Sequence, residues 1–180
     1  MTRHELISLY TEGTRDFQGA DLQGAKLQGA KLMYANLRGA KLQDADLQGA
    51  KLMYANLRGA KLQDADLQGA KLIYANLRGA KLRGANLQGA KLQGADLQDA
   101  DLQDANLMYA NLQGADLMYA NLRGAKLRGA DLRCITLCGA IIDGAILDHG
   151  DIGGPGHILC ALTNTEWAWV KQQREEAHNE

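Results

Sequence analysis

A large apolar residue recurs every five residues from Phe17 to Ile152, and this period restricts the fold more than any other feature of the chain. In an α-helix, five residues rotate the side chain by about 140°, so these residues would spiral around the helix instead of forming one buried stripe. Five is also odd, so on a flat strand successive members would face opposite sides. The chain must therefore turn every few residues, so that each short segment points its large apolar side chain at a common axis. This arrangement is a solenoid.

An internal duplication indicates the number of sides in each coil. Residues 31–50 (KLMYANLRGAKLQDADLQGA) recur unchanged as residues 51–70. A duplication of this length leaves the fold intact if 20 residues make a whole number of coils. Four sides of five residues fit that length, so we expect a four-sided coil.

The tandem motif A-[DNK]-L-x-x over residues 15–154 resembles the pentapeptide-repeat family. The segment YTEGTRDFQGADL is also similar to the way many cyanobacterial members enter their first coil. The resemblance implies an all-β, right-handed quadrilateral parallel β-helix, here of about seven coils if each coil takes 20 residues. The expected organisation is an N-terminal capping helix in residues 1–13, the β-helix in 14–154 and a C-terminal cap with a helix in 155–180.

Each position of the repeat has its own expected task. The central Leu and the Ala two residues before it should both point inward, and the Ala must be small because backbones approach closely at the corner. Gly is the commonest residue two positions after the Leu, where a turn requires a positive φ. The sequence therefore predicts a core of stacked Leu and Ala.

Residues 2–13 are expected to form the N-terminal helix. Thr2 and Glu5 have the spacing of a capping box, and Gly13 can end the helix. The first coil of a solenoid exposes leucines and unpaired strand edges, so this helix is expected to cover them.

The repeat pattern decays after Leu132, where Ile141 and Ile146 occupy positions that were polar in earlier coils. These isoleucines need a cover or a partner. Thr163 and Glu166 have capping-box spacing ahead of a helix that carries Trp167 and Trp169. The tryptophans are expected either to cover the last coil or to anchor a partner or a second copy in an end-to-end homodimer. A monomer is the other expectation.

Stacking should place residues 20 apart above one another and so turn the repeat into surface columns. Three such columns form what we call the basic-aromatic strip: Lys31, Tyr34, Arg38, Lys51, Tyr54, Arg58, Lys71, Tyr74 and Arg78. Cations interleaved with aromatic rings suit an acidic protein partner, or less readily a nucleic acid. Duplication of a coil also copies its surface, so the strip needs no selection for binding. Nearby carboxylates are expected to neutralise Lys41 and Lys61; they are Asp44, Asp46, Asp64 and Asp66.

No sequence motif for catalysis, a cofactor or a phosphate-binding loop is present, so the expected protein is not an enzyme and has no cofactor. One cluster near the end has metal-capable residues: Cys134, Cys138, His149, His157 and Cys160. Their spacing fits no zinc motif, and free thiols with surface histidines are expected instead. The odd number of cysteines, the polar N-terminus and the lack of a long apolar run predict a cytoplasmic protein that does not enter membranes.

These observations favour a non-catalytic structural or protein-interaction scaffold that binds a partner through a rigid surface. The family resemblance implies one alternative, a DNA mimic that binds gyrase. Such mimicry depends on a strongly acidic surface. Residues 14–153 instead contain 9 Lys and 8 Arg against 15 Asp, a formal charge of +2, which disfavours the alternative.

Overall fold

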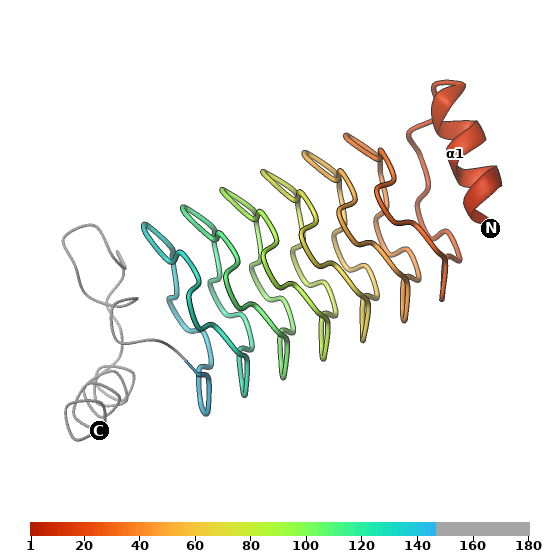
Figure 1. The fold of residues 1–180 in the computed structure, drawn as a ribbon. Coiled ribbons are helices and arrows are strands. Elements are labelled where there is room, and N and C mark those ends of the chain that lie inside the picture. The colour runs from red at the N-terminus through yellow and green to blue at the C-terminus, as the bar shows by residue number, and fades with distance from the viewer. Residues whose placement is uncertain (147–180) are drawn as a thin grey trace, which may run out of the picture.

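The computed structural model describes residues 1–146, which form a helix followed by a four-sided stack of coils (Figure 1). Consecutive coils are joined by parallel bridges between residues 20 apart, such as Lys31 with Lys51 and Asn36 with Asn56. The bridges recur on each of four sides, the last joining Lys126 to Ile146. The predicted register of 20 residues per coil is therefore confirmed.

Each side consists of one bridge residue, an inward Leu and a tight turn. The Leu37 amide donates to the carbonyl of Asn56 in the next coil at 2.7 Å, and the Asn56 amide donates to Ala35 at 2.9 Å. Within the coil, the Ala40 amide donates to Leu37 at 3.0 Å and closes a four-residue turn. Gly39 has a φ of 64° in this turn, as the third position of a type II turn requires. The turn recurs every five residues, which explains the period.

The Asn and Asp residues that precede many of the leucines stabilise the turn and the stack together. The Asn56 side-chain oxygen accepts from the Arg58 amide at 3.1 Å, and its side-chain nitrogen donates to Asn36 at 3.2 Å. An amide satisfies both requirements because it carries a donor and an acceptor. Asn36 and Asn56 therefore form one step of an amide ladder between adjoining coils.

The core is made of the predicted Leu and Ala columns. Leu32, Leu52 and Leu72 are fully buried, and every repeat alanine from Ala30 to Ala145 is buried too. Ala20 and Ala25, in the first coil, are only partly buried. Ile135 stands in an alanine column and is also buried.

Helix α1 runs from Arg3 to Thr11 and packs on the first coil through Leu6, which is fully buried. Thr2 is the N-cap of a complete capping box: the Glu5 amide donates to its hydroxyl at 3.2 Å, and its own amide donates to the Glu5 carboxylate at 2.7 Å. This hydrogen bond from the backbone of Thr2 lowers the pKa of Glu5. No helix in residues 1–146 is long and apolar enough to cross a membrane.

The far end of the described stack exposes the two isoleucines that the sequence singled out. Ile141 and Ile146 are 42% and 40% exposed. Trp167, Trp169 and the helix predicted around them lie outside the described residues, so their role stays a prediction.

Candidate partner-binding surface

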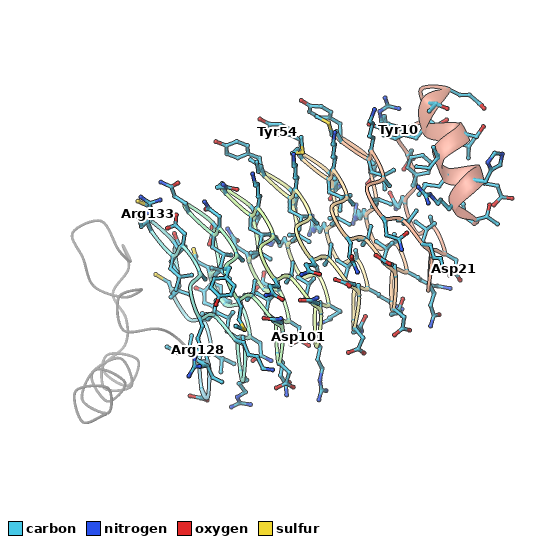
Figure 2. All side chains as sticks on the ribbon, viewed as in Figure 1. Tyr10, Asp21, Tyr54, Asp101, Arg128 and Arg133 are labelled. Atoms are coloured by element: carbon cyan, nitrogen blue, oxygen red, sulfur yellow. The ribbon has the colours of Figure 1, made fainter. Side chains whose placement is uncertain are left out.

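The structure brings the residues of the basic-aromatic strip together on one edge of the rod. Bridges join Lys31 to Lys51 and Lys51 to Lys71, so these lysines stand in register on one side of the coil. The tyrosines follow at the next corner, and the arginines lie on the side after it. Figure 2 shows Tyr54 projecting outward from this edge.

The three tyrosines of the strip form a ladder of stacked rings. The ring centroids of Tyr34 and Tyr54 are 5.1 Å apart with 3° between the ring planes, and those of Tyr54 and Tyr74 are 5.4 Å apart at 21°. The ladder ends at Gly94, because glycine has no ring to stack. The ring of Tyr74 leans over this glycine and occupies the space that a Cβ atom would take there. The rings nevertheless remain exposed, Tyr34 by 61% and Tyr54 by 49%.

The tyrosines occupy a backbone conformation that disfavours them. Tyr34 and Tyr54 both have a φ of 59°, at a position where most five-residue repeats have Gly. Left-handed backbone costs an L-residue other than Gly about 1–2 kcal/mol, and a stacked aromatic pair returns about 0.5–1.5 kcal/mol. The stabilisation from stacking is therefore about equal to the cost of the backbone strain, so stability alone does not explain the ladder.

Two substitutions of Tyr54 separate ring stacking from backbone strain. Tyr54→Gly removes both and is expected to be more stable than Tyr54→Ala by about 1 kcal/mol, because alanine loses the ring but keeps the positive φ. Urea denaturation of both variants measures the difference. Arg58, whose φ is not positive, provides the control. There the order reverses, and Arg58→Gly is the less stable variant. Equal stability of the two Tyr54 variants would contradict the strain.

The lysines of the strip lack compensating carboxylates. Among residues 1–146, no ion pair involves Lys31, Lys51 or Lys71. Arg78 differs, because its guanidinium lies 3.3 Å from the Asp99 carboxylate. Both groups of that pair are about half exposed, and such surface pairs contribute little stability. The strip is therefore positively charged, and the Asp99 carboxylate reduces this positive charge beside Arg78.

The prediction about neutralised lysines was wrong for Lys41, whose partner is Asp21 at 3.0 Å and not a neighbouring Asp44 or Asp46. This hydrogen bond from Lys41 lowers the pKa of Asp21. Asp46 instead accepts a hydrogen bond from Gln28, and Asp66 accepts one from Gln48 at 2.6 Å. Each of these three contacts joins adjoining coils.

Three features of this surface were not predicted from the sequence. Tyr109 and Tyr119 are as exposed as the strip tyrosines, but they lie at other corners and stack with no other tyrosine among the described residues. Their identical Met-Tyr-Ala-Asn context could have identified them. Asp99, the partner of Arg78, was also missed.

The cysteine cluster gives no metal site within residues 1–146, where no group of three or more His, Cys, Asp or Glu could hold an ion. Cys134 is exposed. His149, His157 and Cys160 lie outside the described residues.

Comparison with known proteins identifies the family. The family described as "Pentapeptide repeats (8 copies)" matches residues 16–49, 30–69, 50–89, 60–99, 85–124 and 120–154. No curated protein matches the chain. Among solved structures, QnrB1, a plasmid-mediated fluoroquinolone resistance protein, is similar with a TM-score of 0.60 at 19% identity, covering 88% of this chain and 84% of its own. This likeness concerns the fold alone.

Two further structures come from photosynthetic organisms. HetL, a pentapeptide repeat protein involved in heterocyst differentiation regulation in the cyanobacterium Nostoc sp. strain PCC 7120, is 34% identical over 88% of this chain and 100% of its own, with a TM-score of 0.28. A pentapeptide repeat protein from the thylakoid lumen of Arabidopsis thaliana is 30% identical over 63% of this chain and 69% of its own, with a TM-score of 0.42. From the matched residues and the four-sided register, the chain belongs to the pentapeptide-repeat family, whose fold is a right-handed quadrilateral β-helix.

Proposed function

We propose that this chain is a non-catalytic scaffold that binds an acidic protein partner through the basic-aromatic strip. The observation that carries the proposal is the ladder of exposed tyrosines beside lysines that no described carboxylate neutralises. Tyrosine and arginine dominate the binding energy of protein interfaces, and a rigid surface loses little entropy on binding. A convex rod without a catalytic motif supports binding better than a reaction.

The ladder geometry favours a protein over a single-stranded nucleic acid. Bases bind aromatic side chains by stacking on an open ring face. Tyr34 and Tyr54 are nearly parallel, so the faces between them are already covered by each other. The ladder therefore offers ring edges and hydroxyl groups, which suit the polar and apolar groups of a protein surface.

Gyrase binding by DNA mimicry is the weaker alternative. A phosphate mimic needs rows of carboxylates, whereas the described edge carries rows of lysine and arginine. The likeness to QnrB1 at 19% identity supports a common fold and carries no partner with it.

The finer features of the scaffold are part of the proposal. We infer about seven coils from the 20-residue register and the extent of the repeat, with α1 and residues 155–180 as caps. We also propose a cytoplasmic protein that contacts no membrane. Ile141 and Ile146 support either a covered end or an end-to-end homodimer, and light scattering at several protein concentrations distinguishes the two.

Charge reversal on the strip tests the function. The variant Lys51→Glu/Arg58→Glu/Lys71→Glu is expected to lose its captured partner, with affinity at least about tenfold weaker, because it reverses the field that attracts an acidic surface. Partners are captured on the full chain from an extract of the native organism, identified by mass spectrometry and then purified for titration at two salt concentrations.

A matched control carries the same charge change on the opposite side. Residues ten positions away in a four-sided coil lie on the opposite face, where Lys61→Glu/Lys81→Glu/Arg83→Glu replaces two lysines and one arginine. The control is expected to keep wild-type affinity. Equal loss in both triple variants would indicate a non-specific effect of net charge, and unchanged capture by the strip variant would remove the strip from the interface.

A further inference from the structure

A cleft of about 590 Å³ separates α1 from the first coils. Ile7 and Tyr10 of the helix and Ala30 of the coil give it an apolar floor. Arg3, His4 and Lys31 also line it. Figure 2 shows Tyr10 where α1 meets the stack. The volume falls within the range of about 300–1,000 Å³ typical of sites for small molecules.

The helix is held at both ends, so the cleft between the attachments has fixed walls. At one end, the Met1 ammonium donates to the Asp21 carbonyl at 2.8 Å. At the other end, the Tyr10 hydroxyl donates to the Met33 carbonyl at 3.0 Å. The Arg15 guanidinium lies 3.9 Å from the centre of the Tyr10 ring and donates to the Tyr10 carbonyl at 2.7 Å. Leu6 fills the contact between helix and coil, and Ile7 beside it remains only partly buried.

The charged lining of the cleft has a single sign. Arg3, His4 and Lys31 contribute basic groups, and the lining contains no carboxylate. None of the three forms an ion pair within residues 1–146. A ligand that matches this lining has an apolar body for the floor and one anionic group for the basic residues.

We propose that the cleft between α1 and the first coils binds a small amphipathic organic anion, an aryl or alkyl acid. The apolar body lies on Ile7, Tyr10 and Ala30, and the acid group pairs with Arg3 and Lys31. This site shares Lys31 with the strip, but it does not rest on the proposed partner binding.

Fluorescence titration with 8-anilinonaphthalene-1-sulfonate tests the site on the full chain. We expect saturable binding at one site that decanoate displaces and that the uncharged N-phenyl-1-naphthylamine does not reproduce. Arg3→Glu and Lys31→Glu are each expected to weaken binding at least about fivefold, because each places a carboxylate beside the acid group. Lys91→Glu, three coils further along the same column and outside the strip, is the matched control and leaves binding unchanged.

A second variant fills the cleft without changing its charge. Ile7→Trp is expected to abolish binding, and a circular dichroism spectrum and melting temperature like those of the wild type show that the fold is kept. Amide chemical shifts of Ile7, Ala30 and Lys31 should move on titration with decanoate. Undiminished probe binding in both Ile7→Trp and Arg3→Glu would overturn the proposal, as would an equal loss in Lys31→Glu and Lys91→Glu.

Discussion

Replacing Leu77 with alanine is expected to lower the free energy of unfolding by about 2–5 kcal/mol, the range for large-to-small changes in a packed core. Leu77 is fully buried near the middle of the rod. The coils on either side are held by backbone hydrogen bonds of 2.7 Å, from the Leu57 amide to Asn76 and from the Leu77 amide to Asp96. These bonds fix the spacing, so the coils cannot close around the cavity.

Equilibrium denaturation in urea measures this effect, with Gln68→Ala as an exposed control that should change the free energy by less than about 0.5 kcal/mol. In a solenoid each coil contacts only its neighbours, so a weak central coil can also reduce cooperativity. A lower denaturant slope or a second transition in Leu77→Ala would reveal such uncoupling. If the free energy of unfolding falls by less than about 1 kcal/mol and the denaturant slope is unchanged, the coils have moved together and closed the cavity.

The backbone of this protein could be predicted from sequence because one local rule is repeated in every coil. The five-residue period places the turn, and the duplication of residues 31–50 gives the register that the bridge from Lys31 to Lys51 confirms. The columns of the strip follow from that register alone. No long-range folding argument was needed, because the backbone bridges between coils always join residues 20 apart.

The contacts of the surface side chains could not be predicted in the same way. Arg78 pairs with Asp99, which is not its column neighbour, and Gln28 donates to Asp46, 18 residues away. These choices depend on side-chain rotamers, which differ little in energy on an exposed surface. The cleft beside α1 was also absent from the sequence analysis. It depends on where Tyr10 and Met1 attach to the coils, and the repeat carries no signal for those contacts.

The alanine columns set the closest approach at the corners, and a larger residue there is expected to be the second most damaging change. Ala75 is buried between Ala55 and Ala95 of the adjoining coils. Ala75→Ile adds three carbon atoms at a position that backbone hydrogen bonds hold on both sides, such as the one from the Asn76 amide to Ala55 at 2.9 Å. Overpacking of this kind costs about 1–3 kcal/mol, and urea denaturation measures it.

Ile135 tests how large a residue the alanine column accepts, because it occupies the same column as Ala75 and is buried there. In the coil before it, Ile135 follows Ala115, so an isoleucine fits against an alanine on at least one side. If each site is packed to fit its own residue, Ile135→Ala should destabilise the protein by leaving a cavity, and Ala75→Ile should destabilise it by overfilling. If Ile135→Ala is neutral and Ala75→Ile is harmless, the column accepts either residue. The small residue would then reflect the duplication of a coil instead of the space inside it.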